Sequence, residues 1–331
     1  MPIEHPAAPG IHGLAIPTPF AVGRVNVWLI EDEPLTLVDS GPNSGKALYE
    51  LEQSLGALGH RVEDLELLVV THQHIDHLGL TDILAERSGA EVAALDLLAP
   101  FTEHFSRAAE ADDAFSVELM LRHGVAEPVT QALRAVSAAF RGWGGSVHVT
   151  RPLAAGAELT FRDRSLRVHH RPGHSPSDTV FADEERGVLI GGDHLLAHIS
   201  SNPLVARPLP GTEPADGSRP RALVAYIESL RATRELDLAV VLPGHGDPVT
   251  DHRALIDERL RLHERRATKI YRLLGDGPRT AHEVARAMWG EVAITQAFLT
   301  LSEVLGHVDL LLADGRATEA QEDGVVRFAA T

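Results

Sequence analysis

The sequence predicts an α/β fold, and three observations support this prediction. Patterns typical of strands and of helices alternate through residues 25–95. Strand patterns return after residue 145 and continue to residue 190, and helical patterns dominate from residue 251 onward. Such alternation is typical of sheets covered by helices. We therefore expect one large domain over residues 1–250 and a smaller one over residues 251–331.

Composition restricts the class of protein. The 331 residues are 44% hydrophobic and 23% charged, which is ordinary for a globular protein. The formal net charge of −17 disfavours a general affinity for nucleic-acid backbones or anionic membranes. The chain has no Cys, which excludes disulfides, thiolate ligands and cysteine nucleophiles. Neither a leader peptide nor a run of about 18 apolar residues is visible, so we expect a cytoplasmic protein.

The first elements are expected to be two strands and a helix. Residues 25–30 are rich in β-branched and aromatic side chains, and residues 35–38 form a second strand-like run after a turn. Together they predict a hairpin that ends at Asp39. Residues 44–58 carry apolar side chains at helical spacing and predict a helix.

The most informative stretch follows the apolar run 65–70, which predicts a buried strand, and reads Thr-His-Gln-His-Ile-Asp-His-Leu-Gly. His72 and His74 lie two positions apart beyond a strand end and therefore point the same way. Asp76 and His77 follow where the chain turns toward a helix, and they can face a second point. Imidazole and carboxylate groups are common ligands of zinc and similar metals, so the stretch predicts two ligands for each of two metal ions. The alternative is a polar loop with a chance cluster, drawn from the 19 His of the chain.

Residues 97–142 interrupt the α/β pattern. A helix is expected over residues 81–87 and a strand over residues 91–95, but the segment that follows has no strand pattern. Its apolar side chains are typical of two or three helices. We expect a helical insertion, either a lid over the metal loops or a helical pair that packs on the sheet.

Strand patterns then return and lead into three more loops with metal-type side chains. The expected strands are residues 147–149, 159–161, 166–169, 179–181, 187–190 and 236–242. His174, Asp193 and His245 each follow a strand and lie near a glycine, which permits close backbone approach. Four strand-end loops with metal-type ligands argue against coincidence. Between them, residues 203–220 contain five Pro and predict a long loop, and residues 222–230 predict a helix.

Together these residues resemble the metallo-β-lactamase fold superfamily. Residues 72–77 match its H-x-H-x-D-H signature, and the resemblance covers roughly residues 10–250. It implies an αββα sandwich of two mixed sheets with helices outside and two metal ions at one edge. By this resemblance one metal is bound by His72, His74 and His174, and the other by Asp76, His77 and His245. Asp193 would bridge the two metals, and Asp39 would orient the ligands.

The resemblance also implies a mechanism. Two metals about 3.5–4 Å apart would share a hydroxide, whose pKa they lower toward neutrality. Asp76 would hold and aim this metal-bound hydroxide at an activated carbonyl, and Asp193 or a metal-bound water would supply a proton to the leaving group. Two zinc ions are expected, although iron and manganese also suit ligands that are all nitrogen and oxygen.

Several substrates are compatible with this site. A thioester, as in glyoxalase II, is our first interpretation, followed by lactones and related esters, although this C-terminus does not resemble the glutathione-binding region of glyoxalase II. The alternative is a metal-dependent phosphodiesterase or single-stranded ribonuclease, which the net charge disfavours. A β-lactamase is less favoured because no zinc-ligating Cys is present. A non-catalytic binding protein is less favoured because every ligand position is filled.

The C-terminal residues 251–331 are expected to form a winged-helix-like domain, since helical patterns up to residue 311 precede a hairpin around Glu322-Asp323-Gly324. Residues 261–331 contain 9 Lys and Arg against 10 Asp and Glu, a net charge of −1 that disfavours DNA binding. Basic residues between 253 and 269 would suit an anionic substrate such as a CoA thioester. Acidic residues are interleaved with them, so we interpret this stretch as a solvated helix face. We expect a small-molecule substrate, no membrane partner, and a packing or homodimer role for this domain.

Overall fold

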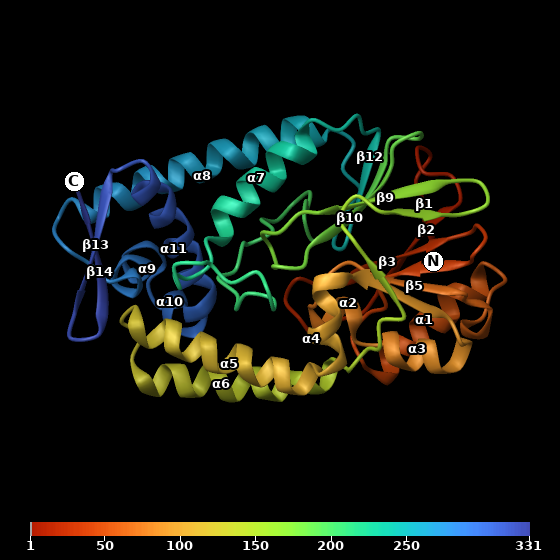
Figure 1. The fold of residues 1–331 in the computed structure, drawn as a ribbon, viewed down its shortest axis with the longest axis horizontal. Helices are drawn as coiled ribbons and strands as arrows, with labels where there is room; N and C mark the ends of the chain where they lie inside the picture. Colours follow the sequence, from red (N-terminus) through yellow and green to blue (C-terminus); the bar gives the residue numbers. More distant parts are fainter. Residues whose placement is uncertain (1) are drawn as a thin grey trace.

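Two sheets form the centre of the fold in a computed structural model that describes residues 2–331 (Figure 1). The first has seven strands in chain order: β1 (Ile3–Glu4), β2 (Ile11–Ile16), β3 (Val25–Ile30), β4 (Thr36–Val38), β5 (Leu67–Val70), β6 (Glu91–Leu95) and β7 (Arg151–Leu153). Neighbours are antiparallel from β1 to β4 and parallel from β4 to β7. The second sheet has the order β12-β11-β10-β9-β8, from β8 (Glu158–Thr160), β9 (Ser165–His170), β10 (Thr179–Asp183), β11 (Val188–Gly192) and β12 (Val240–Pro243). Only its β11–β12 pair is parallel.

Alternation along the strands explains why the sheets pack face to face. Successive side chains of a strand point to opposite faces. In β5, Leu67 and Val69 join the core between the sheets, where they meet Phe181 and Ile190 of the second sheet. Leu68 belongs to a separate core on the other face, together with the apolar side of the first helices. The central strands are therefore buried on both faces, as expected for a layered α/β fold.

Helices cover both outer faces. The first sheet is covered by α1 (Gly45–Ala57), α2 (Ile75–Leu78) and α3 (Thr81–Ser88), and the second by α7 (Ala222–Arg234) and α8 (His252–Leu274). Ser44 begins α1, because its side chain accepts a hydrogen bond from the backbone N–H of Ala47 at 3.0 Å. The predicted αββα sandwich is thus confirmed. No helix in residues 2–331 is both long and apolar enough to cross a bilayer.

The helical insertion packs on the first sheet at its start and on the C-terminal helices farther along. It consists of α4 (Ala99–Glu103), α5 (Phe105–Arg122) and α6 (Glu127–Phe140) and extends along one side of the molecule toward the C-terminal elements (Figure 1). Leu119, Met120 and Val125 belong to the same core as α9 (Ala281–Trp289), α10 (Val292–Thr295) and α11 (Ala297–Ala313). The insertion therefore does not pack on the sheet alone, which was one of the two expectations for it.

The C-terminal elements follow the expected order of helices and then a hairpin. Thr280 and Glu283 form a reciprocal capping box at the start of α9. The hairpin of β13 (Ala317–Glu322) and β14 (Val325–Ala330) follows α11 and pairs antiparallel. The relation to winged-helix domains and the domain limits at residues 250 and 251 stay predictions.

Two expected strands differ from the structure. Residues 147–149 do not join a sheet, and the strand is β7, which begins at Arg151. The apolar alternation there has another cause, since Val147 and Val149 are buried in the helix-side core and the Val147 N–H donates to the Thr102 carbonyl at 2.9 Å. The strand expected over residues 236–242 pairs only from Val240 onward, because its first part packs against the core under α7 and α8.

The basic stretch of α8 is not simply a solvated face. Arg259 donates to the backbone carbonyls of residues 196, 197 and 199, each at 3.2 Å. Arg266 forms an ion pair with the buried Glu303 of α11. These two arginines therefore attach α8 to its neighbours.

Two histidines near the C-terminal core are expected to make stability fall in acid. Burial lowers the pKa of His123 to about 3, and burial with the nearby His307 lowers the pKa of His263 to about 4. The unfolded value is about 6.5, so between these values the unfolded chain binds protons that the folded chain does not. The free energy of unfolding should therefore decline as the pH falls from about 6.5 toward 4, by on the order of a few kcal/mol.

Urea unfolding at pH 7.5 and pH 5 measures this decline. His263→Gln should reduce the difference between the two pH values, whereas His148→Gln, whose side chain is 76% exposed, should leave it unchanged. If the free energy of unfolding changed between the two pH values by the same amount in wild type and His263→Gln, His263 would not be a titrating group.

Candidate metal centre

Strand ends bring the predicted ligands together at one edge of the sandwich. His72, His74, Asp76 and His77 follow β5 and continue into α2. The other three come from the second sheet. His174 lies in the loop between β9 and β10, Asp193 directly follows β11, and His245 lies two residues after β12. Their donor atoms form overlapping groups of three, and the atoms of each group lie within 4.8 Å of one another. The first group is His72, His74 and His174, the second is Asp76, His77 and His245, and His72, His77 and Asp193 connect the two. Residues separated by more than 170 positions thus meet at one site.

The first group consists of three imidazoles. His74 Nδ1 lies 3.1 Å from His72 Nε2 and 2.9 Å from His174 Nε2. The ligands of a tetrahedral zinc ion, each about 2.0–2.1 Å from the metal, lie roughly 3.3 Å apart. The spacing of the three nitrogens therefore fits a common metal ion.

The outer nitrogens of these rings are held by the protein. His174 Nδ1 donates to the Ser201 carbonyl at 2.5 Å, and His72 Nδ1 lies 2.9 Å from Thr71 Oγ1. A hydrogen bond on one ring nitrogen sets the tautomer and leaves the other nitrogen with a free lone pair. His72 and His174 thus direct acceptor nitrogens to the same point.

The second group combines imidazoles with a carboxylate. His245 Nε2 lies 3.3 Å from Asp76 Oδ2, and His245 Nδ1 lies 2.8 Å from the Arg24 carbonyl. His77 Nδ1 lies 2.7 Å from Asp39 Oδ2, which leaves His77 Nε2 to face the site. Each ring is again held through its outer nitrogen.

Asp193 lies between the two groups. Its Oδ1 is 3.4 Å from His77 Nε2, and its Oδ2 is 3.5 Å from His174 Nε2 and 3.6 Å from His245 Nε2. One carboxylate therefore contacts histidines of both groups, which is the position that a bridging ligand requires.

Charges within the buried site shift several pKa values. Burial, strengthened by His174, lowers the pKa of His74 to about 3. Burial acts in the same direction on His77, but the carboxylates of Asp193, Asp39 and Asp76 outweigh it and raise its pKa well above the usual value. Burial would raise the pKa of Asp193, but the charge of His77 holds it well below its usual range. The charges of His77 and Asp193 thus stabilise each other's ionised form.

Unpartnered buried atoms show that the residues fit a cation. His77 Nε2 and Asp193 Oδ1 are buried, and neither has a hydrogen-bond partner within residues 2–331. Leaving buried polar atoms unpaired costs about 1–3 kcal/mol each. A divalent cation would satisfy both atoms, and the donor set of imidazole and carboxylate suits zinc, iron or manganese.

The arrangement around Asp39 explains its expected role. Asp39 is 3% exposed and accepts hydrogen bonds from the Thr71 N–H and hydroxyl, both at 2.9 Å, besides facing His77. Thr71 also contacts the ring of His72, so one carboxylate positions ligands of both groups. Thr71 is a site residue that was not predicted from the sequence, although its place directly before His72 could have suggested it.

Two further polar contacts were not predicted. The Ser177 hydroxyl donates to the side chain of Gln73, which connects the ligand loop after β5 to the loop after β9. His194, which follows Asp193, is 1% exposed and lies 2.9 Å from the Thr233 hydroxyl on α7. His194 therefore belongs to the packing beneath the site.

A second buried group with metal-type atoms lies outside this centre. It consists of His263, Glu303 and His307, between α8 and α11. Most of its polar atoms pair within the protein, since Glu303 binds Arg266 and His263 Nδ1 lies 3.2 Å from His307 Nε2, whereas the buried His263 Nε2 has no hydrogen-bond partner among residues 2–331. The spacing of Glu303 and His307, four residues apart on a helix, was the only signal for it in the sequence.

Gly244 limits the space beside the centre. A Cβ atom at this position would lie 2.7 Å from His77 Cε1 and closer still to Asp193 Oδ1. Gly244→Ala should therefore displace both side chains and lower the metal content and the activity, each at least about tenfold. Gly45→Ala is the matched control, since its Cβ would meet open space. Wild-type metal content in Gly244→Ala, measured by mass spectrometry, would show that the centre tolerates the change.

An αββα sandwich with imidazoles and carboxylates at the strand ends defines a class of metal-dependent hydrolases. The family model described as the metallo-beta-lactamase superfamily matches residues 21–245. The chain belongs to this superfamily.

Relatives of known name agree with this assignment. The chain is 33% identical over 315 residues to a protein of Bacillus subtilis (strain 168) named "Probable metallo-hydrolase YqjP", which covers 95% of this chain and 96% of the relative. A crystal structure of a beta-lactamase domain protein from Burkholderia ambifaria has a TM-score of 0.78 at 27% identity and covers 99% of this chain and 94% of that chain. The acyl-coenzyme A thioesterase MBLAC2 of Gallus gallus is 28% identical over 51% of this chain and 57% of its own length.

Proposed function

We propose that this protein is a dinuclear metal-dependent thioesterase. The position of Asp193 between two ligand groups is the observation that carries the dinuclear proposal. His72, His74 and His174 would hold one divalent ion, Asp76, His77 and His245 the other, and Asp193 would contact both. We propose zinc as the metal, because three imidazoles at this spacing are a common zinc ligand set.

When bound, such ions polarise a carbonyl oxygen and lower the pKa of water. The residues of the chain supply orientation and proton transfer. Asp76 is partly accessible, with a side chain that is 12% exposed, so its carboxylate can orient an attacking water and accept its proton. Asp193 is more enclosed, and its charge balances the imidazoles that surround it.

Leaving-group chemistry favours a thioester. A thiol has a pKa of about 8.5, so the departing thiolate needs little help from an acid. The proton that Asp76 accepts from the water suffices to neutralise it. The likeness to a protein named as an acyl-coenzyme A thioesterase supports the same substrate class.

Other substrates have weaker support. A lactone or activated ester could react at the same carbonyl position, and these remain our second choice. Cleavage of single-stranded RNA is disfavoured by the net charge of −17. For residues 251–331 we propose a packing role, because α9 and α11 share a core with the helical insertion.

Initial rates on a substrate panel test the proposed function. The panel contains S-lactoylglutathione, an acyl-CoA, an acyl-pantetheine, a γ-lactone, a chromogenic cephalosporin and a single-stranded RNA. We expect thioesters to be hydrolysed at least about tenfold faster than the lactone, with loss of all activity in His74→Ala. RNA cleavage with the same metal dependence, or lactone rates above thioester rates, would contradict the proposal.

A further inference from the structure

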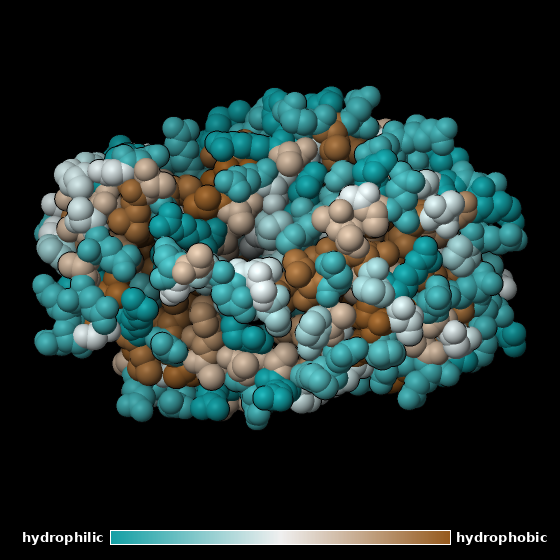
Figure 2. All heavy atoms as spheres, in the orientation of Figure 1, coloured by the Kyte–Doolittle hydropathy of each residue, from teal (hydrophilic) through white to brown (hydrophobic). Residues whose placement is uncertain are grey.

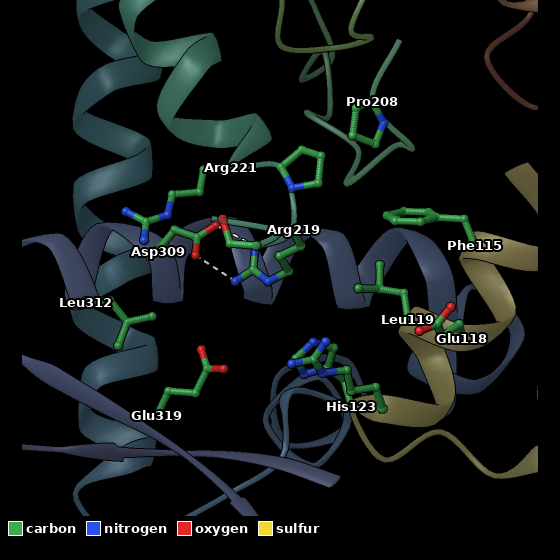
Figure 3. Close-up of a pocket in the computed structure, with 14 residues that line it drawn as sticks. Phe115, Glu118, Leu119, His123, Pro208, Arg219, Arg221, Asp309, Leu312 and Glu319 are labelled. Atoms are coloured by element: carbon green, nitrogen blue, oxygen red, sulfur yellow. Dashed lines mark hydrogen bonds and ion pairs between the residues drawn. The ribbon is translucent and has the colours of Figure 1, made fainter. Parts of the chain in front are cut away.

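We propose that an arginine-lined cavity between the helical insertion and the C-terminal helices binds the phosphate of a 4′-phosphopantetheine thioester. This inference rests on the proposed thioesterase function and names the part of the substrate that lies beyond the reacting carbonyl. The cavity has a volume of about 280 Å³ and is bounded by α5, α11, β13 and the loop before α7 (Figure 3).

Three arginines line this cavity. Arg219 forms a bidentate ion pair with the buried Asp309, at 2.6 and 2.7 Å, so its charge is balanced. The guanidinium groups of Arg122 and Arg221 form no ion pair or hydrogen bond with any residue in the part of the chain that the structure describes, residues 2–331. Arginine is well suited to bind phosphate, because its planar donors match the phosphate oxygens. Arg122 and Arg221 are thus exposed residues of the cavity wall whose guanidinium groups have no partner within residues 2–331.

Acidic side chains also line the cavity, and Glu118, Asp309 and Glu319 balance the formal charge of its three arginines. Glu118 and Glu319 lie at its exposed edge, on α5 and on β13, at opposite sides of the view (Figure 3). Neither forms an ion pair with Arg122 or Arg221. We therefore expect the unpaired arginines to attract an anion, and Glu319 to oppose its binding.

A buried histidine provides a further polar group. His123 is 2% exposed, lines the cavity and stacks on Phe328 with ring centroids 5.8 Å apart. Its Nδ1 atom is buried and has no hydrogen-bond partner among residues 2–331. A buried polar atom without a partner is costly unless a ligand or water satisfies it. His123 therefore adds to the cavity wall a side chain with an unpaired polar atom.

A second cavity connects this region to the ligand loop. It also has a volume of about 280 Å³, and it shares Pro208, Pro220 and Arg221 with the first cavity. At its other end it is lined by Gly173 and Ser175, the neighbours of His174. Figure 2 shows the surface hollowed near the middle of the molecule, between hydrophobic and hydrophilic patches. The two cavities therefore adjoin and extend away from the metal centre.

The order of these surfaces matches one ligand chemistry. The cavity near His174 is mainly apolar, with Leu204 and Ala206 among its walls, and suits an uncharged arm. The arginine-lined cavity lies farther away, and its two unpaired arginines suit an anionic end. A 4′-phosphopantetheine thioester has the same order of groups, with a thioester at one end, an amide arm and a phosphate at the other end.

Calorimetric titration of the metal-loaded protein tests the inference independently of turnover. We expect 4′-phosphopantetheine to bind at least about tenfold more tightly than pantetheine, which lacks the phosphate. Arg122→Gln and Arg221→Gln should each weaken binding of 4′-phosphopantetheine about three- to tenfold and leave pantetheine unchanged. Arg134→Gln is the matched control, an exposed arginine of α6 that lines neither cavity.

A substitution that removes a negative charge should have the opposite effect on binding. Glu319→Gln removes an opposing charge and should tighten binding of 4′-phosphopantetheine about two- to threefold. Equal affinities for 4′-phosphopantetheine and pantetheine, or equal losses in Arg122→Gln and Arg134→Gln, would overturn the inference even if thioesters are hydrolysed.

Kinetic measurements distinguish the sources of the phosphopantetheine group. Acyl-CoA, an acyl carrier protein thioester and acyl-pantetheine carry the same acyl group in three assays. In Arg122→Gln we expect KM to rise for the first two substrates, with kcat unchanged, because the contact binds substrate and transition state alike. A preference for CoA or for the carrier protein identifies the source. If none of the three thioesters were hydrolysed, the proposed function would be contradicted. The binding experiment would then still decide whether the cavity binds the phosphate.

Discussion

Asp193→Asn is expected to lower both metal content and thioester hydrolysis strongly. Asparagine has the same shape but no charge, so the variant removes the carboxylate that contacts histidines of both groups. We expect less than one metal ion per chain. We also expect a rate loss on the order of a thousandfold, because metal ions contribute several kcal/mol of transition-state stabilisation.

Asp247→Asn is the matched control for this prediction. Asp247 lies two residues after His245, and its side chain is 82% exposed. The control should keep wild-type metal content and rate. If Asp193→Asn retained two metal ions and rates within tenfold of wild type, Asp193 would not bridge the groups.

Asp39→Asn is expected to weaken metal binding without removing a ligand. Asp39 has a φ of 62°, in the left-handed region that asparagine tolerates well, so this substitution avoids backbone strain. It removes the charge that faces His77 and one of the acceptors for Thr71. Groups that orient ligands typically contribute 10–100-fold to metal affinity, and we expect a loss in that range.

Competition with a chromogenic chelator measures this affinity. Asp64→Asn is the control, an aspartate at the surface turn before β5 that pairs with Arg61. A rate that recovers when excess metal is added would agree with a positioning role for Asp39. Unchanged affinity would show that the hydrogen bonds of Asp39 serve only the fold.

The sequence indicated the site well because local pattern and ligand chemistry coincide. The H-x-H-x-D-H stretch follows a run of buried apolar residues, and each distant ligand follows a strand, so strand-end geometry alone could bring them together. The helix α1, which has clear apolar spacing and a capping residue, was predicted nearly to the residue.

Tertiary contacts account for what could not be predicted. Apolar alternation at Val147 and Val149 arises from packing against α4, which no local pattern distinguishes from a strand. The ring contacts of Thr71 and Ser201 depend on the side-chain directions of residues brought together by folding. The arginine-lined cavity joins α5, α11 and the 217–221 loop, which are far apart in the chain, so composition could not reveal it.

The number of metal ions per chain tests the central claim most directly. The purified protein is loaded with zinc, freed of excess metal and measured by inductively coupled plasma mass spectrometry, with His74→Ala alongside. We predict two ions per chain in the wild type and at most one in His74→Ala. Less than one ion per chain in the wild type, even after loading with zinc, iron or manganese, would contradict a dinuclear centre formed by these seven side chains.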